Sequence, residues 1–177
     1  MMIDIGQYKI RDWQKSDALS ITKYANNRKI WKNLRDGFPH PYNFSDAESF
    51  LSLVLSQEPR TYFAIASNEE AVGSIGLGIG SDVHRFTAEL GFWLAEPFWN
   101  KGIMTEAVLR FTEYAFEKFR LHRIYAEPYV TNPASARVLE KAGFILEGTL
   151  RANVYKDGKV LDQLLYAQVR EKLRRSC

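Results

Sequence analysis

The chain has 177 residues, of which 46% are hydrophobic and 25% are charged. This composition indicates a globular protein with a substantial core and argues against disorder. The net charge at pH 7 is only +3, and basic residues alternate with acidic ones, so the basic stripe of a nucleic-acid-binding protein is not expected. Only the tail is mainly basic, and we interpret its cations as the solvated end of the chain: Arg170, Lys172, Arg174 and Arg175.

Few side chains could hold a metal or form a disulfide. The single cysteine is Cys177, and His40, His84 and His122 lie far apart in the sequence, so we expect neither a metal site nor a disulfide. No segment approaches the roughly 20 apolar residues that span a membrane, and no apolar signal run begins the chain. We therefore expect one cytoplasmic domain over residues 1–177, with no membrane or nucleic-acid partner.

The first third of the chain predicts a strand and two helices. Residues 1–10 alternate like a strand, and Ser16-Asp17 begins a helix with one apolar face, formed by Ala18, Ile21 and Ala25. After a turn-rich stretch at residues 34–42, Ser45 and Glu48 form the pattern of a capping box. The helix that follows has apolar residues at helical spacing: Ala47, Phe50, Leu51, Val54 and Leu55.

The middle of the chain predicts three strands, at residues 62–67, 72–79 and 86–94. The links between them are short, as is typical of antiparallel hairpins. The second strand is rich in alternating glycines, but no helix follows it, which argues against a dinucleotide-binding loop. We interpret it as a strand with a bare face, and we expect the missing side chains to make room for substrate.

A helix, a strand and a second helix are expected next. Gly102 precedes the first helix, whose buried face would consist of Met104, Ala107, Val108, Phe111 and Ala115. Residues 123–130 predict the strand. Asn132 followed by Pro133 is typical of a helix start, with a capping side chain before proline at the first helical position. Gly143 is a typical stop for that helix.

Two strands complete the chain, at residues 144–156 and 161–169, joined in a hairpin by Asp157-Gly158. The predicted order is βααβββαβαββ. Three antiparallel strands lead into a strand–helix–strand unit, so we expect an α/β (α+β) fold with a mixed sheet and helices on both faces.

The stretch from Ala88 to Ala107 carries the most information about function. A strand ends there, a short loop turns at Gly102, and a helix begins. Such a loop directs backbone N–H groups toward one point, and the helix N-terminus adds the positive end of its dipole. Lys101 adds a full positive charge. This arrangement suits a pyrophosphate, although a purely structural turn is the alternative on these grounds alone.

This stretch resembles the acetyl-CoA-binding motif of the GNAT acetyltransferases, in the branch of the ribosomal-protein N-terminal acetyltransferases (RimJ/RimL type). The superfamily motif is Arg/Gln-x-x-Gly-x-Gly/Ala, and this chain keeps its central Gly102, with Trp99 and Met104 at the outer positions. Residues 121–124 and 132–144 form a second block similar to that branch. The similarity continues through Glu147, Gly148, Arg151, Tyr155, Asp157, Gly158, Asp162 and Tyr166.

The resemblance implies the GNAT acyl-CoA N-acyltransferase fold and an amine that attacks acetyl-CoA directly in a ternary complex, without a metal. The strand ending at Trp93 and Leu94 would separate from its neighbour, pair with pantetheine and polarise the thioester like an oxyanion hole. Asn132 would hold the pantetheine arm. The rest of the cofactor would lie on Trp99, Asn100, Lys101, Gly102, Ile103, Met104 and Thr105.

The same resemblance implies catalytic residues. Ser135 matches the serine proposed to protonate the departing thiolate, although a polar first-turn residue is the alternative. Val154 stands where the branch has a glutamate as general base, and Glu89 is the substitute, acting through water. For Glu89 the alternative is a carboxylate paired with an arginine near the sheet.

The acceptor stays open. Acceptor binding would involve Phe38, Pro39 and Tyr42 in one loop, together with Tyr155. The acceptor could be the α-amino group of a peptide or protein, or a small amine such as a polyamine, an amino acid or an antibiotic. A third alternative for the function is a regulatory module that binds CoA without turnover. A homodimer is possible as well, and the sequence leaves the oligomeric state open.

Overall fold

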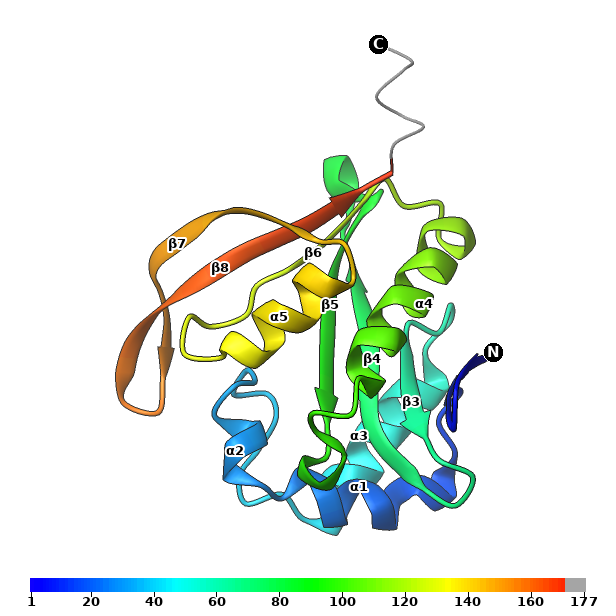
Figure 1. Cartoon of the computed structure of the whole chain (residues 1–177). Helices are drawn as coiled ribbons and strands as arrows, with labels where there is room; N and C mark the ends of the chain where they lie inside the picture. Colours follow the sequence, from blue (N-terminus) through cyan, green and yellow to red (C-terminus); the bar gives the residue numbers. More distant parts are fainter. Residues whose placement is uncertain (171–177) are drawn as a thin grey trace. The chain divides into compact units, whose positions relative to one another are not determined.

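A computed structural model describes residues 1–170 of the chain (Figure 1). These residues form two compact units. The first contains residues 1–76 and 92–107, and the second contains residues 77–91 and those from 108 onward. Three elements contribute residues to both units: β4 (Ala71–Ile79), β5 (Thr87–Leu94) and α4 (Ile103–Lys118). The expectation of a single domain over the whole chain stays a prediction.

The strands form an eight-stranded sheet in the order β1-β2-β3-β4-β5-β6-β8-β7. The other strands are β1 (Met2–Ile5), β2 (Tyr8–Arg11), β3 (Tyr62–Ala66), β6 (Arg123–Ala126), β7 (Ile145–Lys156) and β8 (Lys159–Val169). The β5–β6 pair is parallel, with Thr87 opposite Arg123, whereas the β1–β2, β2–β3, β3–β4, β6–β8 and β7–β8 pairs are antiparallel. The predicted mixed sheet with a strand–helix–strand unit is therefore confirmed.

The first unit holds α1 (Ala18–Ala25), α2 (Arg28–Trp31) and α3 (Phe44–Ser56). The predicted apolar faces of α1 and α3 are buried in one core with residues of β3 and β4. Its members are Trp13, Ala18, Ile21, Ala25, Tyr42, Ala47, Leu51, Val54, Ala64 and Ala71. Burying a side chain the size of Leu or Val contributes about 1.5–3 kcal/mol. Because Tyr42 belongs to this core, the loop that precedes α3 is anchored to it.

Two predictions for the first unit were wrong, and one of its helices was not predicted. The N-terminal strand is a hairpin that turns at Gly6, where φ is +74°. The cap of α3 is Asn43, not Ser45: Asn43 Oδ1 accepts from the Asp46 backbone N–H at 3.2 Å, and Asp46 Oδ2 accepts from that of Asn43 at 2.8 Å. The short helix α2 has only four residues and the sequence does not predict it.

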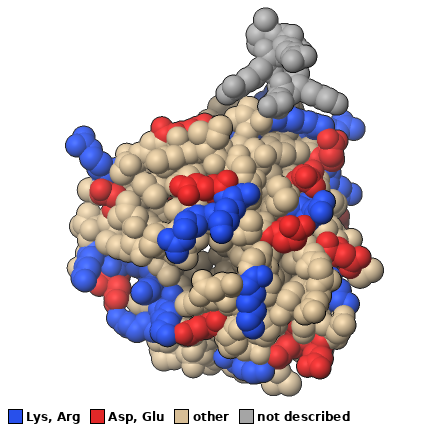
Figure 2. Space-filling view, in the orientation of Figure 1, with Lys and Arg blue, Asp and Glu red and all other residues tan. Residues whose placement is uncertain are grey.

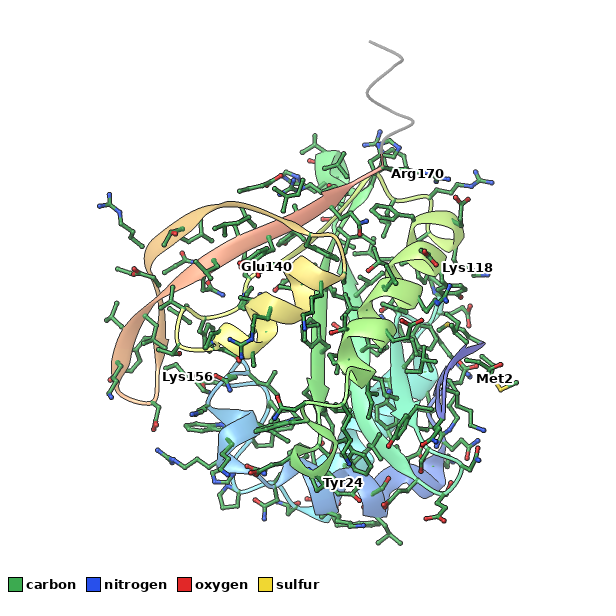
Figure 3. All side chains as sticks on the ribbon, viewed as in Figure 1. Met2, Tyr24, Lys118, Glu140, Lys156 and Arg170 are labelled. Carbon is green, nitrogen blue, oxygen red and sulfur yellow. The ribbon has the colours of Figure 1, made fainter. Side chains whose placement is uncertain are left out.

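The second unit contains α5 (Pro133–Lys141), which packs against β7 and β8. Glu140, labelled in Figure 3, accepts a hydrogen bond from the Tyr166 hydroxyl of β8 at 2.7 Å. Burial, followed by this bond, raises the pKa of Tyr166 to about 12. Asn132 caps α5 through a bond from the Ser135 N–H, as predicted. The helix therefore has a fixed start and a fixed packing partner.

Two turns of the second unit occur at the residues where the sequence predicts them. Gly143 has a φ of +87° after α5, and Asp157 and Gly158 have φ of +51° and +77° between β7 and β8. Two consecutive positive φ values are typical of the tight hairpin turn that the Asp-Gly pair predicts. The predicted strand at residues 123–130 is shorter than expected, since β6 ends at Ala126.

Arg170 is fixed, which corrects its interpretation as part of a solvated tail. Its backbone N–H donates to the His122 carbonyl at 3.0 Å, and its guanidinium contacts the Phe116 carbonyl and pairs with Glu117. The other tail cations and Cys177 lie outside the described residues. Within residues 1–170, no three His, Cys, Asp or Glu side chains gather as a metal site would require, and no helix is long and apolar enough to cross a membrane.

Candidate functional site

The loop between β5 and α4, in the first unit, has the geometry of an anion site. Asn100 and Gly102 have positive φ, of 59° and 76°, and both are exposed together with Lys101. A Cβ placed on Gly102 would meet no atom within 4 Å, so the backbone is accessible there. The first N–H groups of α4 have no acceptor within the helix and carry the positive end of its dipole. The residues present therefore fit a pyrophosphate.

Trp99 holds this loop closed from within. Its indole Nε1 donates to the Leu94 carbonyl at 2.7 Å, and the Ala95 N–H donates to the Val72 carbonyl at 2.8 Å. The Leu94 carbonyl is thus already engaged, which limits the free backbone expected at the end of β5. Ile103 and Met104 have side chains only 7% exposed. Their expected cofactor contacts would therefore have to come from the backbone.

A polar link joins α2 to the same loop. Asn27 Nδ2 donates to Glu96 Oε2 at 2.8 Å, and Lys29 forms an ion pair with the same carboxylate. The hydrogen bonds from Lys29 and then Asn27 lower the pKa of Glu96. The sequence does not predict this link. Glu96 lies 67 positions from Lys29 and 69 from Asn27, and no local pattern connects them.

The acceptor loop, which we define as residues 38–42, lies against the end of β5. The Phe38 ring is 6.0 Å from that of Trp93 in an edge contact and 5.0 Å from that of Tyr42. Tyr42 is only 5% exposed, and burial raises its pKa to about 12. Phe38 and Pro39 are half-buried, so they offer surface beside Trp93 while Tyr42 packs beneath. A direct acceptor contact by these three residues stays a prediction.

In the glycine-rich stretch of β4 and the residue after it, the protein itself fills the space beside Gly73, Gly76 and Gly80, whereas a Cβ on Gly78 would meet no atom within 4 Å. A Cβ on Gly73 would lie 2.5 Å from the Trp93 carbonyl oxygen, and one on Gly76 would lie 2.3 Å from the Tyr62 ring. A Cβ on Gly80 would lie 2.5 Å from the His84 carbonyl oxygen. The expectation that these missing side chains make room for substrate is wrong there. The absence of a side chain at these glycines lets Trp93, Tyr62 and His84 approach the backbone closely.

The second unit holds the residues with predicted catalytic roles. Glu89 is half-buried and lies opposite Tyr125, the last matched pair of β5 and β6, although β5 continues beyond it. This ending fits the expected separation of the two parallel strands. Ser135 is half-buried in the first turn of α5. Asn132 Oδ1 caps that turn at 3.3 Å, and its amide NH₂ takes no part in this bond.

Tyr155 and Val154 lie near the end of β7. Val154 pairs with Leu161, and Tyr155 is 68% exposed. A valine cannot accept a proton, so the replacement of the branch's glutamate removes a base from this strand. The roles of Ser135, Glu89 and Tyr155 stay predictions.

The chain is similar to known proteins in both sequence and fold. Residues 8–145 match the family model of the GNAT acetyltransferase domain. YjcK of Bacillus subtilis is 41% identical over 106 residues, a match that covers 59% of each chain, so the chain spans less than two thirds of that relative. The ribosomal-protein-serine acetyltransferase of Escherichia coli is 31% identical over 60% of this chain and 59% of its own. A spermidine N(1)-acetyltransferase of Vibrio cholerae is 26% identical over 89% of this chain and 90% of its own.

Among solved structures, RimJ of Mycobacterium smegmatis in complex with CoA-disulfide has a TM-score of 0.83 and 26% identity, over 96% of this chain and 85% of its own. The fold is that of an α/β protein, and its strand–glycine–helix loop has a geometry that suits a phosphate-bearing ligand at a helix N-terminus. The chain belongs to the GNAT acetyltransferase family, because that family's model matches most of its length.

Proposed function

We propose that the chain acetylates the α-amino group at a peptide or protein N-terminus. Acetyl-CoA, when bound, supplies the acetyl group as a thioester. The exposed backbone at Asn100, Lys101 and Gly102 would hold its pyrophosphate, and the amide NH₂ of Asn132 would hold its pantetheine arm. The amine nitrogen would form a bond to the thioester carbonyl carbon as the carbon–sulfur bond breaks.

Two side chains would move the protons of this transfer. Glu89 would take a proton from the amine through water, and the Ser135 hydroxyl would give one to the departing thiolate. Ser135 lies in a turn fixed by Asn132, which supports a stable position for its hydroxyl. Glu89 lies in a paired part of β5, so its backbone is fixed as well.

The observation that carries the choice of acceptor is Val154 at the position of the branch's glutamate. An amine must be neutral to attack. An α-amino group with a pKa of roughly 7.7–8.0 loses its proton at pH 7 for about 1 kcal/mol, whereas a lysine side chain near 10.4 requires nearly 5 kcal/mol. With a weak, water-mediated base, the acceptor of lower pKa reacts more easily.

A polyamine is the second candidate, and one relative named for spermidine acetylation supports it. The relative named for a ribosomal protein supports a protein N-terminus instead. The experiment is mass spectrometry of one peptide that carries both a free N-terminus and an internal lysine, after incubation with acetyl-CoA and the protein. We expect acetylation at the N-terminus. Acetylation mainly at the lysine would contradict the proposal, and faster turnover of spermidine than of any peptide would favour the second candidate.

A further inference from the structure

A cationic surface begins at α2. Residues 28–35 contain four basic side chains and no acidic one, so the expectation that only the tail is mainly basic is wrong. Asp36 follows directly, and the cations are Arg28, Lys29, Lys32 and Arg35. All four are exposed. Figure 2 shows Lys and Arg side chains gathered over α2, at the lower left. The chain's overall charge is only +3, so this segment concentrates positive charge that the rest of the molecule largely balances.

Contacts within the first unit join this cationic surface to the end of β5. Lys29 pairs with Glu96, just after β5. The Trp31 ring, in α2, is 5.6 Å from the ring of His40 in the acceptor loop. Phe38 of the same loop contacts Trp93 in β5. The cations therefore border the acceptor loop and the end of β5, where the family resemblance predicts that the acceptor binds.

His40 gives a second, independent sign of polar recognition in this loop. Its Nδ1 is buried and makes no hydrogen bond within the described part of the chain. Buried polar atoms are almost always hydrogen-bonded, so an exception in a loop expected to bind substrate suggests a polar group of a ligand as its partner. Its ring lies against Trp31, and this contact limits the plane in which the imidazole can lie.

We propose that the acceptor carries acidic residues within the first few positions after its α-amino group. This inference rests on the proposed function and narrows its substrate class. Negative charge on the acceptor would be attracted to Lys32 and its neighbours, whereas a polyamine would be repelled by the same surface. Two unit charges 4 Å apart in water attract by about 1 kcal/mol, or about fivefold in rate or affinity.

The experiment compares two peptides with the same N-terminal residue, Ser-Asp-Glu-Asp and Ser-Asn-Gln-Asn, each followed by the same neutral sequence. The readout is kcat/KM from release of the CoA thiol, with spermidine as a third acceptor. We expect about a fivefold to 25-fold preference for the acidic peptide at low salt. The preference should shrink at 0.3 M salt, because the screening length is already about 10 Å at 0.1 M.

A pair of variants tests the cationic surface itself. Lys32→Glu reverses one exposed charge of α2 and should remove most of the preference for the acidic peptide. Lys15→Glu reverses an exposed lysine in the turn before α1 and should leave the preference unchanged. Equal effects of the two variants would overturn the assignment of the surface.

The two proposals fail in different ways. Equal kcat/KM for both peptides at low salt would overturn the acidic acceptor and leave N-terminal acetylation standing. Turnover of spermidine with neither peptide acetylated would overturn both proposals.

Discussion

Gly102→Val separates a backbone effect from a ligand effect, because the chain supplies a matched control. Gly102 and Gly6 both lie in the first unit, with φ of +76° and +74°, and a Cβ on either would meet nothing within 4 Å. A side chain in this left-handed region costs roughly 1–2 kcal/mol. Gly6 lies in the β1–β2 turn, whereas Gly102 lies directly before α4.

The stability cost should therefore be the same for the two variants. For a protein of this size, 1 kcal/mol lowers Tm by about 2–4 °C, so both Gly102→Val and Gly6→Val should melt about 2–8 °C below the parent. Only Gly102→Val adds bulk where the pyrophosphate is expected to approach the backbone. We expect it to bind acetyl-CoA at least tenfold more weakly, and Gly6→Val to bind it normally.

The assays are calorimetric titration with acetyl-CoA and thermal melting of each variant without ligand. Melting first establishes that both variants are folded at the temperature of the titration. A folded Gly102→Val protein with undiminished affinity would refute the placement of the cofactor at this loop. Weak binding by both variants would show that stability, not contact with the ligand, controls affinity.

Two further predictions concern Ser135 and Glu96. Ser135→Ala should lower kcat by about 10²–10⁴-fold, with a smaller change in KM for acetyl-CoA, because a proton donor acts on the transition state. An unchanged kcat, with product release shown not to limit it, would show that Ser135 is a structural residue of the helix turn and not a proton donor. Lys29→Ala should raise the pKa of Glu96 toward its ordinary value, measured by NMR titration of the carboxyl carbon, because the Lys29 hydrogen bond is the main cause of the lowered pKa. Because the pKa of Glu96 is lowered in the folded protein, the ionised carboxylate stabilises the fold at pH values above its ordinary pKa of about 4.3. This stabilisation is lost as the pH falls through the pKa of the folded state. An unchanged pKa of Glu96 in Lys29→Ala would contradict the link.

Local signals in the sequence predict local structure well in this protein. Asn132, Gly143 and the Asp157-Gly158 pair each act within a few residues, and each occurs as predicted. The N-terminal hairpin is missed because apolar alternation continues on both sides of Gly6. The family motif likewise locates the β5–α4 loop from a short stretch of sequence.

Features that depend on distant residues could not be predicted in the same way. The space beside Gly76 is filled by Tyr62, from the neighbouring strand, and Glu96 is bound by Asn27, the cap of α2, and by Lys29 within it. Neither contact leaves a pattern in the sequence. The cationic surface is different, since four basic residues within residues 28–35 are visible in the sequence, and a count of charge by segment would have found it.

The indole of Trp99 changes how the loss of the family's Arg/Gln should be understood. A guanidinium or amide at that position could reach toward a ligand, whereas Trp99 bonds to the Leu94 carbonyl of its own loop. A loop that is already closed has less conformational freedom to lose when a ligand arrives, and ordering one residue's backbone costs about 1–2 kcal/mol. In this chain the residue at that position would therefore contribute to cofactor binding by ordering the loop in advance, and not by contacting the cofactor directly. Its affinity for cofactor should then depend on the rigidity of five residues of backbone, from 95 to 99, as much as on any side chain that touches the phosphates.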